Sequence, residues 1–245
     1  MTARRLLIVQ HVPHERLGTF EPALASGGMI RYLNAADERA EWPSLDEVDG
    51  LVVMGGPQSV SEQARDPFLK RELALLREAL TRGRPILGVC LGAQLLSAAL
   101  GGRVTKSPQK EIGWYPLMRE PGADGDALCA PFGQTETVFQ WHGDTYSLPQ
   151  GAVRLASSPQ CREQAFRYGD RVYGVQFHLE MTAAMIRAWM RIPLNRAELE
   201  GLRGVVDPRA ILYKSPQHLP RLRTLAHHVA TAFCRLLEEP IHAAP

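Results

Sequence analysis

Short apolar runs separated by polar and glycine-rich segments dominate the first half of the chain. Leu6 to Gln10, Gly50 to Met54 and Pro85 to Val89 are short and almost continuously apolar, which is typical of strands buried on both faces of a parallel sheet. Met29 to Leu33 is a further candidate strand. The pattern therefore predicts that this half of the chain contributes buried, parallel strands.

Segments with helical periodicity lie between these runs. A helix is predicted to begin at Asp66-Pro67-Phe68 and to end at Arg82-Gly83, because its leucines recur every three or four residues. A short helix is expected near Glu21 to Ala25, and an apolar, buried helix over Leu91 to Leu100. Strands that alternate with helices predict a three-layer α/β domain with a mostly parallel central sheet flanked by helices.

The second half of the chain changes character. Its strand candidates are β-rich and separated by turns, which indicates antiparallel additions to the parallel sheet. These candidates are Ile112 to Met118, Thr137 to Trp141, Val153 to Ala156, Gln164 to Tyr168 and Val172 to Gln176.

An amphipathic helix, Thr182 to Met190, precedes a C-terminal extension. Apolar residues at helical spacing from Leu222 to Leu236 predict a terminal helix with one face to bury. We therefore expect a main domain over residues 1–190 and a helical extension over residues 191–245 that packs on the same domain.

The pattern Gly-x-Cys-x-Gly around Cys90 lies where a buried strand gives way to a helix. Glycines on both sides allow close backbone approach, so the thiol is expected to stand out at the strand end. The helix that begins at Leu91 offers unpaired amides and a positive dipole end, which favour a thiolate. The Leu91 amide could also receive an oxyanion formed when the sulfur attacks a carbonyl. A buried structural cysteine is the alternative from this stretch alone.

Two further strand ends carry chemistry. Gly55-Gly56 follows the strand at Gly50, and without side chains the Gly56 amide could point at a bound carbonyl oxygen, although a plain turn is the alternative. His178 and Glu180 stand two residues apart at another strand end, so they lie on one side of the backbone and the carboxylate can orient the ring. Two ordinary surface residues are the alternative there.

Composition narrows the class of protein. The chain has 245 residues, 45% hydrophobic and 22% charged, with a formal net charge of +2, which favours neither nucleic acid nor a membrane as partner. Four widely spaced cysteines indicate no zinc site or disulfide framework and fit a reducing cytoplasm. His11 and His14 lack a carboxylate or cysteine at ligand spacing, so no metal or other cofactor is predicted. No apolar stretch reaches the roughly 20 residues that span a bilayer.

These elements in this order resemble the class I glutamine amidotransferase domain of the Cys-His-Glu type, with a flavodoxin-like fold, over nearly all of residues 5–190. Within that family the chain is similar to stand-alone proteins resembling the glutaminase domain of GMP synthase. The motifs that carry the resemblance are Met54-Gly55-Gly56-Pro57, Gly88-Val89-Cys90-Leu91-Gly92-Ala93-Gln94, Trp141-His142-Gly143-Asp144 and Gln176-Phe177-His178-Leu179-Glu180.

The resemblance implies a role for each matching residue. Cys90 would be the nucleophile, His178 its base and later acid, and Glu180 the group that orients His178. Gly56 and Leu91 would supply oxyanion amides. Gly55, Gln94, Trp141 and His142 would bind the substrate. Apart from the resemblance, the position of Trp114 and Tyr115 after Gly113 suggests a loop near them at the pocket mouth. Leu179 departs from the family pattern, since many members carry proline there.

The implied reaction is hydrolysis of the glutamine side chain through a γ-glutamyl thioester, with release of ammonia and then glutamate. The sequence shows no phosphate-binding loop and no second domain for an ATP-using synthetase, so an acceptor of the ammonia would be a separate chain. Two alternatives stay open: a stand-alone hydrolase of γ-glutamyl peptides or γ-glutamyl amines with the same triad, and a non-catalytic regulatory domain.

Overall fold

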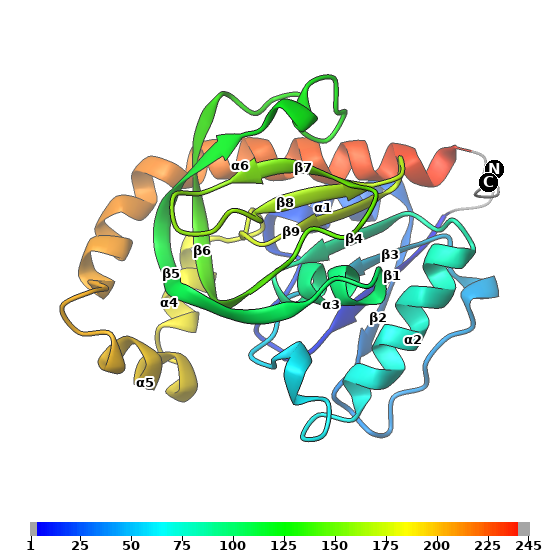
Figure 1. Ribbon diagram of the computed structural model, residues 1–245, viewed down its shortest axis with the longest axis horizontal. Helices are drawn as coiled ribbons and strands as arrows, with labels where there is room; N and C mark the ends of the chain where they lie inside the picture. Colours follow the sequence, from blue (N-terminus) through cyan, green and yellow to red (C-terminus); the bar gives the residue numbers. More distant parts are fainter. Residues whose placement is uncertain (1–3, 240–245) are drawn as a thin grey trace.

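A mixed β-sheet forms the centre of the protein in the computed structural model, which describes residues 4–239 (Figure 1). Five parallel strands make up one half of it. In order across the sheet they are β2 (Met29–Asn34), β1 (Arg5–Gln10), β3 (Gly50–Val53), β4 (Ile86–Val89) and β9 (Val172–Val175). This is the doubly wound order, in which ligands bind beyond the carboxyl ends of the strands. The predicted α/β fold class is confirmed.

Antiparallel strands extend the sheet beyond β9. They follow in the order β8 (Ala165–Tyr168), β7 (Ala152–Ser157), β5 (Val104–Arg119) and β6 (Thr135–Tyr146). One of the five segments predicted as antiparallel additions differs, because β9 is parallel to β4 and antiparallel only to β8. The hairpin strands β5 and β6 are also longer than predicted, since exposed polar residues around a register shift between Lys106 and Glu111 conceal the pairing in the sequence.

The sheet curls so that its last strand returns towards the parallel half. Phe139 on β6 forms an antiparallel bridge with His178, just beyond β9, and the His178 amide donates to the Phe139 carbonyl at 2.9 Å. The curl brings the middle of β6 to the carboxyl ends of the parallel strands.

Helices cover the sheet on both faces (Figure 1). Alternate residues of β1 face opposite sides: Leu7 and Val9 pack in the core under α2 (Phe68–Thr81) and α3 (Leu91–Ala99). Leu6 and Ile8 pack in the core under α1 (Glu21–Gly27), α4 (Ala183–Trp189) and α6 (Pro208–Glu238). The remaining α-helix is α5 (Pro193–Gly201), and short 3₁₀ turns span Gly18–Phe20, Leu45–Glu47, Val60–Glu62 and Pro121–Ala123.

The long helix α6 shares the core of the strands. Its apolar stripe, including Leu222 and Leu225, is buried with Leu6, and Figure 1 shows the helix changing direction in its first half, where Pro216 and Pro220 lie. The division of the chain at residue 190 stays a prediction. No helix among residues 4–239 has the length and apolar character needed to cross a bilayer.

The expectation of a loop at Trp114 and Tyr115 was wrong, whereas the strand predicted over Ile112 to Met118 is confirmed as part of β5. Both lie within β5 rather than in a loop, and the Trp114 indole donates to the Ile211 carbonyl and the Ser215 hydroxyl on α6, at 3.2 Å each. Trp114 therefore anchors α6 to the sheet.

Candidate active site

The predicted site residues gather where β3, β4 and β9 end. Gly56, Cys90, Gln94, Trp141, His142 and His178 all line one cavity of about 670 Å³. Gly55, Leu91 and Glu180 do not line it: Gly55 and Leu91 are next in the chain to the lining residues Gly56 and Cys90, and Glu180 contacts His178. A cavity of this volume is in the range of sites that bind small molecules.

Cys90 occupies a strained turn between β4 and α3. Its φ of 52° and ψ of −108° make it the only residue other than glycine with positive φ among residues 4–239. The flanking glycines allow this turn to pack closely, because a Cβ on Gly92 would lie 2.1 Å from the Val53 carbonyl oxygen. Strain of this kind costs on the order of 1–3 kcal/mol and persists mainly at functional sites.

Gln176 links the sulfur to Gln94. The Gln176 amide nitrogen donates to Cys90 Sγ at 3.5 Å, and its Oε1 accepts from Gln94 Nε2 at 3.1 Å. Gln94 Nε2 also donates to the Asp144 carbonyl at 3.3 Å, so its amide nitrogen already has partners within the protein. Sequence reasoning missed the contact of Gln176 with the sulfur, although Gln176 and His178 are two residues apart on one strand end and therefore share a side.

His178 and Glu180 form a buried pair. The His178 Nδ1 proton is assigned from the acceptor, because the Glu180 carboxylate lies 2.6 Å away. His178 Nε2 has no hydrogen-bond partner among residues 4–239, and the ring lines the cavity with Cys90. Burial lowers the pKa of His178, but the negative charges of Glu180 and Cys90 outweigh it, so the pKa is raised well above its ordinary value. This arrangement favours an imidazolium at His178, beside the Cys90 sulfur.

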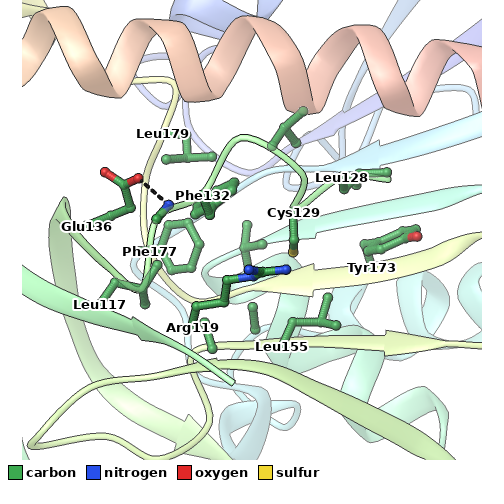
Figure 2. Close-up of a pocket in the computed structure, with 15 residues that line it drawn as sticks. Leu117, Arg119, Leu128, Cys129, Phe132, Glu136, Leu155, Tyr173, Phe177 and Leu179 are labelled. Atoms are coloured by element: carbon green, nitrogen blue, oxygen red, sulfur yellow. Dashed lines mark hydrogen bonds between the residues drawn. The ribbon is translucent and has the colours of Figure 1, made fainter. Parts of the chain in front are cut away.

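Apolar packing holds the strand that carries this pair. Phe177 and Leu179 alternate with His178 and Glu180 and point to the opposite side, into a cluster that also contains Leu117 and Phe132 (Figure 2). The void there is about 30 Å³, roughly the space of one water. It is a packing feature beneath the site and not a ligand cavity. Leu179 is fully buried, so it fills the position where many family members carry proline.

Trp141 and His142 belong to β6, and each contacts a residue of another element. The Trp141 carbonyl lies 3.8 Å from Cys90 Sγ, while His142 Nε2 lies 2.9 Å from Glu111. The Nε2 of His142, the Glu111 carboxylate and the Cys161 sulfur lie within 4.8 Å of one another. Each is engaged in hydrogen bonds, Glu111 also with Ser158 and Gln164, so we interpret this group as a structural network.

Helix α5 forms one wall of the cavity, which sequence reasoning did not anticipate. Leu194, Asn195 and Ala197 line the cavity from this helix. Glu198 fastens it: the Trp141 indole donates to the Glu198 carboxylate at 2.9 Å, and Lys110 forms an ion pair with it. No pattern in the sequence marks Glu198 as a contact residue, because it is one acidic residue on a partly exposed helix of mixed polar and apolar residues.

Glu15 is a second carboxylate at the site and was also missed. It lines the cavity from the loop after β1, and a Cβ on Gly55 would lie 2.2 Å from Glu15 Oε2 and 3.3 Å from His178 Cε1. Burial raises the pKa of Glu15 from 4.5 to about 7, with the charge of Glu180 adding to the rise and those of His178 and His11 opposing it.

Replacing Glu15 with glutamine should stabilise the protein at alkaline pH. The folded state holds the Glu15 proton up to about pH 7, whereas the unfolded chain releases it near pH 4.5, so ionisation of Glu15 opposes folding as pH rises between these values. Glutamine has no such ionisation. We expect Glu15→Gln to be about 1–3 kcal/mol more stable than the wild type at pH 8 and equal at pH 4.5.

Thermal unfolding of the two proteins at both pH values measures this difference. Glu38→Gln is the matched control, since Glu38 is exposed and its replacement should leave the unfolding temperature unchanged. A Glu15→Gln protein no more stable than the wild type at pH 8 would contradict the argument.

Comparison with known proteins finds a family match over the part of the chain that contains Cys90, His178 and Glu180. The family described as "Glutamine amidotransferase class-I" matches residues 27–187. The glutamine amidotransferase-like protein YfeJ of Salmonella typhimurium is 38% identical over 218 residues, which cover 86% of this chain and 91% of that protein.

Two further relatives differ in how much of the chain they share. GMP synthase of Leifsonia xyli is 36% identical over 153 residues, 61% of this chain but only 28% of the synthase. The crystal structure of a glutamine amidotransferase from Thermotoga maritima is 32% identical with a TM-score of 0.85, covering 98% of this chain and 100% of that one. That structure therefore shares the region beyond residue 187, which includes α5 and α6.

Proposed function

Because this chain belongs to the class I glutamine amidotransferase family, we propose that it hydrolyses the γ-carboxamide of glutamine with Cys90 as nucleophile. The observation that carries the proposal is the arrangement of Cys90 on a strained strand-to-helix turn, in one cavity with a His178 that Glu180 orients at 2.6 Å. A nucleophile, a base within the same cavity and a group that orients the base are the parts that covalent catalysis needs.

The reaction has two steps. The Cys90 thiolate attacks the γ-carbonyl carbon of glutamine, and the tetrahedral intermediate collapses to a γ-glutamyl thioester as His178 gives its proton to the departing ammonia. Neutral His178 then takes a proton from a water molecule, which attacks the thioester carbonyl. Glutamate leaves, and the Cys90 sulfur is restored beside a protonated His178.

The proposed supporting residues stabilise charge and hold the substrate. The amides of Gly56 and Leu91 donate to no acceptor among residues 4–239, so both are free to donate to an oxyanion. Gln94 and the backbone around Trp141 and His142 would hold the amino-acid end of the substrate, and Gly55 would shape the turn beside it.

A γ-glutamyl peptide or γ-glutamyl amine is the second candidate substrate. The cavity of about 670 Å³ offers more room than a free amino acid requires, and α5 closes one side of it. The same triad would then release an amine or a peptide instead of ammonia. If glutamine is the substrate, the ammonia acceptor would be a separate synthetase chain, because this chain matches only 28% of the GMP synthase.

A substrate panel separates these possibilities. Glutamate release should be measured with glutamine and with a set of γ-glutamyl peptides and amines, for the wild type and for Cys90→Ala. We expect turnover that depends on Cys90. Preference for a conjugate would identify a self-sufficient hydrolase, and turnover of glutamine alone would identify an amidotransferase subunit. No release of glutamate from any compound would contradict catalysis and favour the regulatory alternative.

A further inference from the structure

A buried ion pair lies directly behind the glycine turn, and the proposed mechanism does not use it. His11 follows β1 and Glu72 lies on α2, and both side chains are completely buried. His11 Nε2 lies 2.9 Å from Glu72 Oε2 and 3.1 Å from Oε1. The other ring nitrogen, Nδ1, lies 2.8 Å from the carbonyl oxygen of Gly55.

The partners determine where the protons of His11 are. A backbone carbonyl and a carboxylate both accept hydrogen bonds and donate none, so both ring nitrogens of His11 donate and the ring is a cation. Burial lowers the pKa of His11, but the charge of Glu72 and the hydrogen bonds to Glu72 and Gly55 outweigh it, so the pKa is raised. Apolar residues often replace a buried ion pair without loss of stability, so this pair calls for a reason other than stability.

Peptide geometry supplies that reason. The Gly55 carbonyl and the Gly56 N–H belong to one planar peptide unit, and no peptide bond among residues 4–239 is cis. In a trans unit the N–H points opposite to the C=O. A carbonyl fixed towards His11 therefore turns the Gly56 N–H away from His11, and Gly56 lines the cavity that holds Cys90.

Gly56 is also closely packed against His11. A Cβ on Gly56 would lie 2.9 Å from both His11 Cβ and Leu91 Cδ2, so no larger residue fits between these two side chains without a shift. A cationic donor on the carbonyl also polarises the peptide unit, which strengthens the N–H as a donor.

We propose that His11 and Glu72 are positioning residues that orient and polarise the Gly55–Gly56 peptide, so that the Gly56 amide is held ready to bind the oxyanion. The inference rests on the proposed hydrolase function and adds two residues to it. Neither side chain touches the substrate; both act through the peptide.

The test compares two reactions of the same sulfur. Acylation by L-γ-glutamyl-p-nitroanilide passes through an oxyanion, whereas alkylation of Cys90 by iodoacetamide does not. In a His11→Leu/Glu72→Met double variant, which removes both charges together, acylation should fall by a factor on the order of 10²–10³. Alkylation of Cys90, followed on its peptide by mass spectrometry, should stay within about threefold of the wild-type rate.

A second double variant tests the hydrogen bond itself. In His11→Asn/Glu72→Gln an uncharged amide can still donate to the Gly55 carbonyl. This variant should therefore be acylated at least tenfold faster than His11→Leu/Glu72→Met. Leu76→Ala is the stability control, since Leu76 is a fully buried residue one turn after Glu72. Its truncation should leave the rate at which the folded protein is acylated unchanged.

The outcomes separate the inference from the proposed function. A wild type that is acylated by the anilide, together with a Leu/Met variant that is acylated equally fast, would overturn the role of the pair alone. Parallel loss of acylation and alkylation would overturn it too, because general disruption then explains both. A wild type that releases no p-nitroaniline and does not hydrolyse glutamine would overturn the hydrolase function and the oxyanion role together.

Discussion

Replacing Cys90 with alanine should lower kcat for hydrolysis of glutamine or a γ-glutamyl conjugate by a factor on the order of 10⁴–10⁶. The thioester cannot form without the sulfur, and no other cysteine lines the cavity among the described residues. Glutamate release with purified Cys90→Ala and wild-type protein measures the effect. Cys161→Ala is the matched control, because Cys161 is also buried but does not line the cavity.

At position 90, the residue that suits the backbone best is not the one that the proposed reaction needs. Cys90 has a φ of 52°, which an L-residue adopts only at a cost, whereas glycine adopts it readily. Cys90→Gly should therefore unfold at a higher temperature than Cys90→Ala, with a free energy of unfolding that is larger by about 1 kcal/mol. Both variants should be equally inactive. Equal activity of Cys90→Ala and the wild type would exclude Cys90 as the nucleophile, and equal stability of the two variants would show that the turn is not strained.

Strands β1, β3 and β4 of the parallel half could be predicted because each is a short apolar run that is followed by a polar residue, glycine or cysteine, whereas β9 was predicted as an antiparallel addition and is parallel to β4. The motifs at Gly55, Cys90 and His178 follow such runs, so parallel strands alone bring them to one edge of the sheet. The contribution of β6 was accessible only through its motif at Trp141. Its approach to His178 depends on the curl of the sheet, and a curl leaves no local pattern in the sequence.

The residues missed at the site share a physical cause. His11 was visible as a histidine at a strand end, but its partner Glu72 lies on α2, where one acidic residue among leucines looks like part of a solvated face. Glu72 is instead completely buried. Glu15 and Glu198 likewise lie on a loop and on a helix without a repeating pattern. Contacts that join residues far apart in the chain follow from tertiary packing, which periodicity does not encode.

The chemistry of the site follows from the layering of charges behind it. Glu180 lies behind His178, and Glu72 with His11 lies behind the Gly55 carbonyl. In both cases a buried carboxylate pairs with one nitrogen of an imidazole. Within the described residues, the second nitrogen of His178 is free of protein partners in the cavity that Cys90 lines, and that of His11 contacts the Gly55 carbonyl. Removing the charge of the carboxylate should therefore affect the protonation of the imidazole more than the shape of the cavity.

Glu180→Gln tests this for the catalytic pair and should lower kcat by a factor on the order of 10²–10⁴. Two effects act together. The charge of Glu180 raises the pKa of His178, so its loss lowers that pKa and leaves less imidazolium beside the thiolate at neutral pH. The glutamine amide can also donate to Nδ1, which favours the tautomer with the proton on Nε2 and prevents that nitrogen from accepting one.

The pH profile distinguishes this role from a structural one. In the proposed mechanism turnover requires protonated His178, so activity should be lost as pH rises through the pKa of His178, and this alkaline limb should move to lower pH in Glu180→Gln. Alkylation of Cys90 by iodoacetamide at pH 7 should slow in parallel, because fewer molecules hold the ion pair. Glu136→Gln is the control, since Glu136 is a buried carboxylate paired with Arg221 away from the cavity. Its alkaline limb should coincide with that of the wild type. An alkaline limb that stays in place in Glu180→Gln, with kcat within tenfold of the wild type, would show that Glu180 does not control the protonation of His178.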